Sequence, residues 1–347
     1  MQKLKVDYII IGQGIAGTWL SHELIKRNKS VLVINKSSEN TSSRKAAGLY
    51  NPITGRKMVN TWRADDFFGS LENDYRQLES LLNARFLHPK PIYRPFRSAE
   101  DQNDWQGKNV EESSNKYVSE LTTWSLAIKD INDPFGGILL NTSGYVDLPR
   151  LLDAYKKFLI DKGIYREEVF DSSEMKETSD GVQYKNYSAQ KILLCEGSSD
   201  SVLCGDLPFK PVRGEIIDIT CDLDTDKIIN QGVWMIPKDG YFSVGSTYDH
   251  KVLTYEPQQD GVTNIKDRLS KIFSGEYRVI DKRAGVRPAT YDRKPFIGFH
   301  KNFRTVGIFN GFGTKGVSLS PYFAKHYADV LEQKDELEKE VSVERTY

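Results

Sequence analysis

The chain of 347 residues has 48 Lys and Arg residues and 48 Asp and Glu residues, so its formal net charge is zero. This length suffices for one large core or two domains, and the balanced charge excludes the broad basic field of a nucleic-acid-binding protein. The five histidines and three cysteines are scattered without the spacing of a zinc site, so we expect no metal.

The chain starts with an apolar run, Tyr8–Ile11, followed at once by Gly12-Gln13-Gly14-Ile15-Ala16-Gly17 and a helical pattern. Gly12 permits the tight turn, Gly14 lets the backbone approach a diphosphate, and Gly17 lets the helix pack closely on the strand. The helix start then binds the diphosphate through its free N–H groups. A glycine-rich turn without a ligand is the alternative, which the cost of three glycines at a helix start disfavours. We assign the diphosphate to Gly12, Gly14, Ile15, Ala16 and Gly17.

The second strand, residues 30–34, ends at Asn35, where dinucleotide-binding folds place Asp or Glu to bind a ribose hydroxyl. Asn35 can also bind a hydroxyl, and Lys36 beside it tolerates a 2′-phosphate. A nicotinamide cofactor therefore stays open at this point. A turn Asn beside a solvated Lys is an equal alternative for this pair.

A small, polar segment, residues 37–47, leads into Ala46-Ala47-Gly48-Leu49, whose small side chains suit a backbone lying against a flat ligand. The apolar spacing predicts a helix over 62–83, on which Asp65-Asp66 is solvated charge. Residues 86–100 favour a strand, and 101–120 favour a loop or a short helix.

A turn at 144–149 opens a helix that ends near Gly163, and strands are expected at 165–170 and 181–187. Residues 191–197 form a buried strand that breaks at Gly197. This second strand that stops at a glycine is typical of a further nucleotide-facing strand in the same sheet.

Residues 208–254 alternate between apolar and polar side chains, which predicts antiparallel strands in a separate layer. An amphipathic helix is expected over 261–273. Residues 283–288 return towards the first domain, and a strand follows at 305–310. A glycine-rich loop, 311–316, opens the last helix, about 317–331, and the charged tail 332–347 is expected to be exposed.

These elements predict an α/β fold with a Rossmann-like cofactor domain and an interleaved antiparallel-sheet substrate domain. The cofactor domain comprises residues 1–84, 141–209 and 283–347. The substrate domain comprises 85–140 and 210–282. No repeat or low-complexity linker separates them, so the chain is expected to cross between the domains several times.

The order of motifs resembles the FAD-dependent D-amino acid oxidase superfamily, in particular its glycine oxidase and sarcosine oxidase branch. The resemblance covers most of the chain. It is carried by the first glycine motif; Ser43 with Ala46-Ala47-Gly48; Gly144-Tyr145-Val146-Asp147; Cys195-Glu196-Gly197; Pro211-Val212-Arg213-Gly214; Gly245-Ser246-Thr247; Gly285-Val286-Arg287-Pro288 with Asp292; Pro295-Phe296-Ile297-Gly298; and Gly311 to Gly316.

The resemblance implies FAD as the cofactor, held by a parallel-sheet domain and covered at its isoalloxazine by an antiparallel domain. Because FAD binds in an extended form, its diphosphate and its ring need separate contacts. The positive end of the helix near Gly316 would stabilise negative charge on the reduced ring. The FAD contacts beyond the first glycine motif are then Asn35, Lys36, Ser43, Arg44, Ala47, Gly48, Leu49, Val169, Glu196, Gly197, Gly311, Gly313, Thr314, Lys315 and Gly316.

Arg287 matches the residue that binds the substrate carboxylate in the glycine oxidase branch. A guanidinium binds a carboxylate through two parallel hydrogen bonds and thereby orients the Cα–H bond. An ordinary ion-paired Arg is the alternative. Lys315 could add a second positive charge, or be a solvated Lys. The chain departs from some relatives at Thr314, where they have a second Arg, and at Ser243, where they have Lys.

The sequence therefore predicts an FAD-dependent amino acid or amine oxidase or dehydrogenase. It would oxidise the CH–NH bond by hydride transfer to flavin N5, giving an imine that hydrolyses. The runner-up is an FAD-dependent dehydrogenase of a 2-hydroxy acid. A flavoprotein within a larger complex is a third reading. A nicotinamide dehydrogenase is disfavoured because such a fold has no need of the loop at 311–316.

The expected compartment follows from two absences. No apolar stretch reaches the roughly 18 residues that span a bilayer, and no charged leader precedes the first strand. The odd, small number of cysteines fits a reducing compartment. We therefore expect a cytoplasmic protein with no transmembrane segment, whose partner is a small amine or amino acid and whose oligomeric state no pattern indicates.

Overall fold

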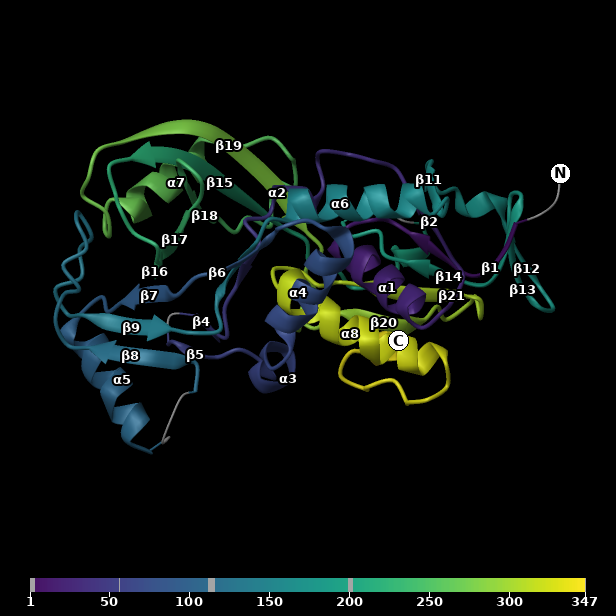
Figure 1. Ribbon diagram of the computed structural model, residues 1–347, viewed down its shortest axis with the longest axis horizontal. Coiled ribbons are helices and arrows are strands. Elements are labelled where there is room, and N and C mark those ends of the chain that lie inside the picture. The colour runs from purple at the N-terminus through teal and green to yellow at the C-terminus, as the bar shows by residue number, and fades with distance from the viewer. Residues whose placement is uncertain (1–3, 56, 112–115, 199–201, 347) are drawn as a thin grey trace.

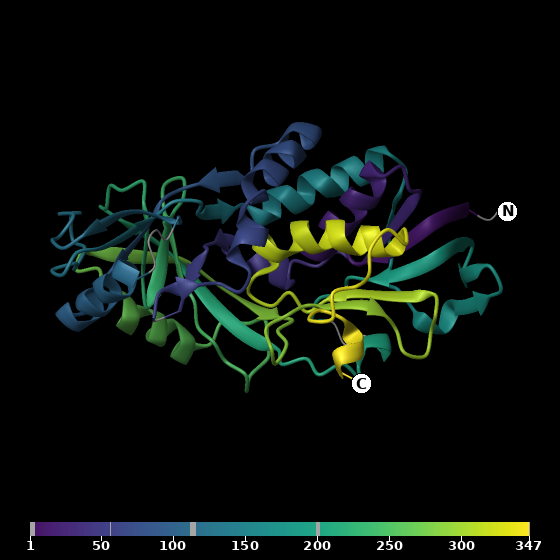
Figure 2. The same cartoon turned by 90° about the horizontal axis from the view of Figure 1, so that it is seen from below.

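Two large β-sheets lie at opposite ends of an elongated molecule in the computed structural model, which describes residues 4–55, 57–111, 116–198 and 202–346 (Figures 1 and 2). Segments from all parts of the chain contribute to the two ends. The sequence predicted this mixed α/β architecture. The domain boundaries given above stay predictions.

The cofactor sheet is mixed: the predicted parallel pairing holds for β11, β2, β1, β14 and β21, whereas β12 and β13 pair antiparallel with each other and with β14. Its strands run in the order β11-β2-β1-β14-β13-β12, β21 pairs parallel with β14, and β20 pairs antiparallel with β21. Apolar side chains of β1 and β2 are buried on both faces, as a covered parallel sheet requires. The bounds are β1 Leu4–Ile11, β2 Val31–Asn35, β11 Tyr165–Glu167, β12 Met175–Thr178, β13 Gly181–Tyr184, β14 Tyr187–Leu194, β20 Phe296–Phe299 and β21 Val306–Asn310.

Three helices pack over one side of this sheet: α1 (Ile15–Lys26), α6 (Leu148–Asp161) and α8 (Gly316–Leu331) (Figure 1). Asp147 caps α6 by accepting a hydrogen bond from the Arg150 backbone N–H. Trp19 and Leu20 of α1 share a core with Phe323 and Tyr327 of α8. The helices therefore hold the first and last glycine loops next to each other.

The substrate sheet has the strand order β19-β15-β18-β17-β16-β7-β9-β8 and is antiparallel except at β16–β7. Helix α7 (Gln259–Leu269) packs on its outer face through Val262, Ile265 and Leu269. The bounds are β7 Ile92–Pro95, β8 Val118–Thr122, β9 Gly137–Leu140, β15 Val212–Cys221, β16 Ile228–Gln231, β17 Val233–Pro237, β18 Phe242–Gly245 and β19 Tyr277–Arg287.

The opposite face of the substrate sheet is called the inner face here, because its apolar residues Ile216, Ile228 and Ile236 join the core of the cofactor domain. Strand alternation and register put further side chains on that face. They are Gly214, Asp218, Trp234, Lys238, Ser243, Gly245, Arg283, Gly285 and Arg287. The inner face is therefore where a ligand between the two domains would lie.

Short elements connect these layers. A three-stranded sheet has the order β3-β10-β6, and β4 pairs with β5. The bounds are α2 Ser42–Lys45, β3 Leu49–Tyr50, β4 Ile53–Thr54, β5 Val59–Asn60, α3 Ala64–Phe68, α4 Leu71–Leu82, β6 Leu87–Pro89, α5 Ala99–Glu111, β10 Gly144–Val146, and the 3₁₀ turns Ser172–Glu174, Val202–Cys204 and Val343–Thr346.

Three expectations need correction. The helix predicted over 62–83 is two helices, α3 and α4, separated at residues 69–70. Residues 101–120 contain most of the 13-residue helix α5 and then strand β8. The tail is not simply exposed, because Val341 and Val343 are fully buried and the Ile297 N–H donates to the Val341 carbonyl at 2.9 Å. Leu337 also packs against the core, and the ion pairs Arg63–Glu338 and Arg345–Asp292 hold the tail as well.

Asp65 and Asp66 are also more than solvated charge. The Asp65 carboxylate accepts a hydrogen bond from Tyr117 at 2.6 Å and pairs with Lys116, while Asp66 pairs with Arg63. In the described part of the chain, no helix is both long and apolar enough to cross a membrane.

Candidate active site and cofactor cradle

Two positions of the first glycine loop, Gly12 and Gly17, have no room for a side chain. Gly12 has φ +97°, and a Cβ there would lie 2.6 Å from the Cys195 carbonyl oxygen. A Cβ on Gly17 would lie 1.9 Å from the Gly12 oxygen. Gly14 caps helix α1 without any side-chain hydrogen bond to the helix start. The Ile15 N–H donates to Ser43 Oγ, so among the described residues the loop leaves the positive end of α1 open to an anionic ligand at Ala16.

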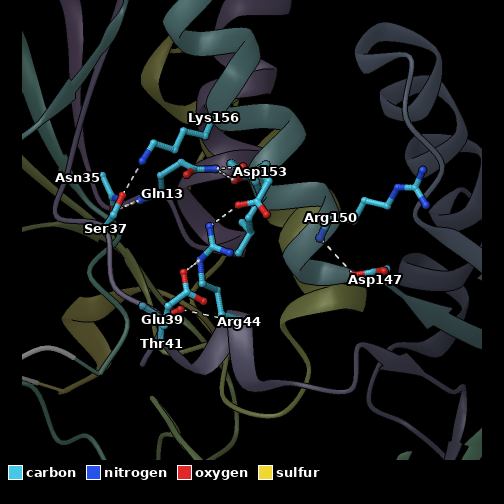
Figure 3. A network of polar contacts seen from close by, with 12 residues as sticks. Gln13, Asn35, Ser37, Glu39, Thr41, Arg44, Asp147, Arg150, Asp153 and Lys156 are labelled. Carbon is cyan, nitrogen blue, oxygen red and sulfur yellow. Dashed lines mark hydrogen bonds and ion pairs between the residues drawn. The ribbon is translucent and has the colours of Figure 1, made fainter. Parts of the chain in front are cut away.

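Asn35 is already engaged where a ribose ligand was expected (Figure 3). Its Oδ1 accepts a hydrogen bond from the Gln13 N–H at 2.9 Å, and its Nδ2 donates to the Tyr165 hydroxyl at 3.2 Å. Asn35 therefore fixes the glycine loop. Lys36 is exposed.

A polar cluster that the sequence analysis missed lies beside Asn35. Lys156 of α6 donates to Ser37 Oγ at 2.7 Å (Figure 3). It also donates to Glu167 Oε2 at 2.7 Å. The hydrogen bond from Lys156 is the main reason that the pKa of Glu167 falls to about 2. Glu167 pairs with Asn35 across β11 and β2. The parallel order of those strands was the only sequence signal that could have brought it to this edge.

Helix α2 holds Ser43 and Arg44 in different directions. Ser43 Oγ accepts a hydrogen bond from the Ile15 N–H at 3.1 Å, so it touches the first glycine loop. Arg44 forms an ion pair with Asp153 of α6 and points there in Figure 3. The structure therefore brings Ser43 to the diphosphate end, and it directs Arg44 to the neighbouring helix.

The segment after α2 is fixed by its backbone. Ala47 is buried, and Gly48 has φ +75° with a virtual Cβ only 1.8 Å from the Val146 oxygen. Leu49 pairs with Tyr145 across β3 and β10. Because only glycine fits position 48, Ala47–Leu49 presents backbone to whatever lies against it.

Two further predicted positions lie at open edges. Val169 follows β11 and is 60% exposed, like several other apolar residues of the described chain. Glu196 and Gly197 follow β14 at the same edge of the sheet, and nothing lies within 4 Å of a Cβ built on Gly197. The buried Asn310 donates to the Gly197 carbonyl at 3.0 Å and so joins this edge to the last glycine loop.

The last glycine loop meets the first. Gly311 and Gly313 have φ of +82° and +54°, and a Cβ on Gly316 would lie 3.0 Å from Ile15 Cγ2. Thr314 is exposed. Lys315 caps helix α8, its ammonium donates to Thr61 Oγ1, and burial lowers its pKa. Lys315 is therefore neither freely solvated nor on the inner face of the substrate sheet.

Arg287 ends strand β19 on the inner face. Its Nη2 donates to Ser246 Oγ at 2.9 Å and its Nη1 to the Thr247 carbonyl at 3.3 Å, while its guanidinium lies 4.9 Å from the Tyr248 ring centre. No carboxylate of the described residues lies at ion-pair distance from it. Burial lowers its pKa, and Tyr248 and Glu215 raise it. Arg287 thus carries a charge whose acceptors are all neutral.

Three more inner-face residues were not predicted. The Trp234 ring covers Gly245, where a Cβ would lie 3.0 Å from it. Arg283 pairs with the Asp218 carboxylate. Lys238 places its ammonium 3.1 Å from the Tyr145 ring centre, and burial is the main reason that its pKa falls to about 7. Long-range register, which a single sequence does not contain, brings these residues together.

Comparison with known proteins identifies the ligand that the two glycine loops and the segment Ala47–Leu49 would bind. Residues 7–330 match the family described as DAO, FAD dependent oxidoreductase. The chain belongs to this family. Its cofactor is accordingly FAD, as the motifs implied.

Solved structures with the same fold include glycine oxidase from Geobacillus kaustophilus, with a TM-score of 0.81, 21% identity and 98% of each chain covered. Iminodiacetate oxidase from Chelativorans sp. BNC1 has a TM-score of 0.77, 18% identity, and coverage of 96% of this chain and 98% of that one. At these identities the likeness concerns the fold.

Relatives in sequence are similar over most of this chain. The glycine oxidase of Geobacillus kaustophilus is 22% identical over 95% of this chain and 94% of its own length. The bifunctional protein ThiO/ThiG of Synechocystis is 22% identical over 94% of this chain, and MnmC of Legionella pneumophila (strain Corby) 26% over 84%. The chain spans about half the length of these last two, 52% and 45% respectively.

The residues present fit FAD. The open start of α1 suits the diphosphate, exposed Val169 and the open space at Gly197 lie at the nucleotide edge, and the backbone at Gly48 and Gly313 suits a flat ring. The contacts of each predicted residue with FAD stay predictions.

Proposed function

We propose that this flavoprotein oxidises the carbon–nitrogen bond of an amino acid or secondary amine whose carboxylate binds Arg287. The proposal rests on the contacts that the Arg287 side chain makes. Its side chain is half-buried, its guanidinium is held by a hydroxyl and a carbonyl, and it has no carboxylate partner among the described residues. A half-buried cation without a counter-charge favours an anionic ligand.

The geometry on the inner face supports binding by two parallel hydrogen bonds. Ser246 and Thr247 hold one side of the planar guanidinium and Tyr248 stacks on it, so its orientation is set before a ligand arrives. A carboxylate on its remaining N–H groups would hold the amine end of the substrate in one orientation. Trp234, three strands away on the same face, adds an apolar wall.

FAD, when bound, supplies the two-electron acceptor for the substrate's hydride. The protein's part is to bind and orient the substrate and to keep water from the reacting bond. Arg287 binds the carboxylate, and the backbone of 46–49 and 311–316 supports the ring side. Hydride loss from a neutral amine gives an iminium ion, which loses its N–H proton to water to form the imine, and water then hydrolyses the carbon–nitrogen double bond.

Names of relatives support this substrate class: glycine oxidase and iminodiacetate oxidase both act on amines that carry a carboxylate on the adjacent carbon. A 2-hydroxy acid would offer Arg287 the same carboxylate. The reacting heteroatom is therefore what an experiment must distinguish.

The decisive experiment is an anaerobic titration of the purified protein, followed by the absorbance of its flavin. Glycine, N-alkylglycines, larger amino acids and the matching 2-hydroxy acids are added in parallel. We expect bleaching by an amine and none by the hydroxy acid of the same carbon skeleton. Bleaching by hydroxy acids alone would replace the proposal with the dehydrogenase reading, and a protein reduced by dithionite but by neither class would support a flavoprotein that acts within a complex.

A further inference from the structure

A closed polar network crosses three neighbouring strands of the inner face. Arg283 of β19 donates through Nη1 to Asp218 of β15 and through Nη2 to Ser243 Oγ of β18 at 3.1 Å. The Ser243 hydroxyl donates in turn to Asp218 Oδ1 at 2.7 Å. The side chains of Arg283 and Asp218 are only 18% and 9% exposed. Each charge in the network is therefore matched inside it.

The third hydrogen bond of the Arg283 guanidinium connects it to a residue outside the substrate sheet. Its Nε donates to the Lys45 carbonyl at 3.3 Å. Lys45 is the last residue of α2 and directly precedes Ala46, Ala47 and Gly48, the backbone expected at the flavin ring. One arginine thus joins the substrate sheet to the start of the flavin-facing segment.

The strand and the helix are also packed closely at this point. A Cβ on Gly285 would lie 3.0 Å from Lys45 Cβ and 3.7 Å from Ser42 Cα, so β19 approaches α2 as nearly as a glycine permits. Within the described chain, no other side chain of β15–β19 donates a hydrogen bond to residues 42–49. The contact through Arg283 is therefore the polar link across this part of the domain interface.

Helix α2 is held on its other sides by the cofactor domain. Ser43 accepts from the Ile15 N–H, and Arg44 pairs with Asp153 of α6. These contacts fix α2 relative to the diphosphate loop but leave its position relative to the substrate sheet open. Among the described residues, the Lys45–Arg283 hydrogen bond and the close packing at Gly285 join α2 to the substrate sheet.

We propose that Arg283, Asp218 and Ser243 form a latch that positions the flavin-facing segment 46–49 against the substrate sheet. Arg283 is a positioning residue: Asp218 and Ser243 fix its guanidinium, and its Nε fixes the Lys45 carbonyl. The buried carboxylate balances the guanidinium, so the latch adds no net charge beside the flavin. It rests on FAD as the cofactor and on no particular substrate.

The test uses the full-length protein and three variants, with FAD as the ligand. Arg283→Met removes all three hydrogen bonds and leaves Asp218 unpaired. Asp218→Asn/Arg283→Met removes the bonds without leaving a charge. Arg283→Lys keeps the charge but lacks the fork. Lys282→Met is the matched control, because Lys282 is an exposed neighbour on the same strand.

Two readouts need no amine: the dissociation constant of FAD and the midpoint potential of the bound flavin. We expect Arg283→Met and the double variant to weaken FAD binding roughly tenfold, since a charge-assisted hydrogen bond is lost. The potential should become more negative in Arg283→Met, because an unpaired carboxylate disfavours electron uptake, and should return towards the wild-type value in the double variant. Arg283→Lys should keep the potential but not the affinity, and Lys282→Met should change neither.

The latch is overturned if a folded Arg283→Met protein binds FAD with wild-type affinity and potential. It is also overturned if the double variant recovers full FAD affinity, because the Lys45 tether would then be irrelevant. Should Arg283→Met fail to fold, the double variant alone decides. A failure of the amine oxidation proposed above leaves these readouts unaffected, so the two failures are distinguishable.

Discussion

Two arginines four residues apart on strand β19 face the same side of the substrate sheet and have opposite surroundings. Arg283 is matched by Asp218, and every side of its guanidinium meets a protein acceptor. Arg287 meets one hydroxyl, one carbonyl and an aromatic ring, with no carboxylate at ion-pair distance in the described chain. A spacing of four residues separates their backbones by about 13 Å.

The presence or absence of a neighbouring carboxylate distinguishes a structural cation from one that is available to a ligand. A buried charge that the protein itself neutralises gains nothing from a further anion, whereas an unneutralised one does. Arg283 therefore fits a role within the protein, and Arg287 fits a role towards the substrate. The predictions below test that separation.

The largest effect is expected for Arg287→Ala. Losing the partner of a buried, charge-assisted contact costs about 2–5 kcal/mol, so the second-order rate of flavin reduction should fall roughly 30- to 4,000-fold. FAD content should stay near the wild-type value, because the Arg287 side chain bonds to Ser246 and Thr247 and, in the described chain, to neither glycine loop. The measurement is anaerobic stopped-flow reduction with a substrate found by the titration, together with the flavin-to-protein absorbance ratio.

Arg287→Lys serves as the matched variant for that experiment. It keeps the charge, but an ammonium cannot reproduce the planar fork, so it should recover little of the rate. Reduction of Arg287→Ala at the wild-type rate would remove Arg287 from substrate binding. Loss of FAD from that variant would instead make Arg287 a cofactor residue and leave Lys315 as the candidate for holding an anionic substrate.

The two arginines also show what a sequence can reveal. The glycine loop was predictable because its constraints are local: a side chain at Gly17 would clash with the Gly12 carbonyl, and one at Gly12 would clash with the neighbouring strand at Cys195. Arg287 stood in a recognisable Gly-Val-Arg-Pro motif. The parallel sheet followed from apolar runs that end at glycines.

No sequence motif pointed to Arg283. Its partner Asp218 lies 65 residues away, and only the register of β15 against β19 brings them together. Lys238 and the Lys156–Glu167 pair were missed for the same reason. The tail was mispredicted because two valines among many charges gave too weak a pattern, although they dock fully.

Lys238 is the third cation of the inner face and gives a comparison with both arginines. It has neither a carboxylate at ion-pair distance in the described chain nor a hydrogen-bonded ammonium, and its pKa of about 7 lies below its ordinary value of about 10.4. The folded state therefore disfavours the protonated form. Below pH 7 the full cost of the buried ammonium is present, and that cost shrinks as the pH rises towards 10.

Lys238→Met should accordingly stabilise the protein by up to a few kcal/mol near pH 6 to 7. The gain should shrink steadily towards pH 10. The measurement is denaturant unfolding of variant and wild type at pH 6, 8 and 10 with a fixed excess of FAD. Exposed Lys282→Met should show no such dependence. A gain that is the same at all three pH values would mean that Lys238 affects stability through packing instead of charge.

The smallest effect is expected for Ser246→Ala, which loosens Arg287 without removing it. Ser246 is buried, and its hydroxyl accepts one guanidinium hydrogen bond at 2.9 Å, while the Thr247 carbonyl and Tyr248 still hold the other groups. A single hydrogen bond of this kind contributes about 0.5–1.5 kcal/mol, so the second-order rate of flavin reduction should fall roughly 2- to 13-fold.

Because the charge of Arg287 remains in Ser246→Ala, the loss should appear at low substrate concentration and diminish at saturation. A fall as large as that of Arg287→Ala would mean that the orientation of the guanidinium, more than its charge, controls the reaction. No fall at all would mean that the carboxylate orients Arg287 by itself, and the comparison with Arg283 would then rest on charge alone.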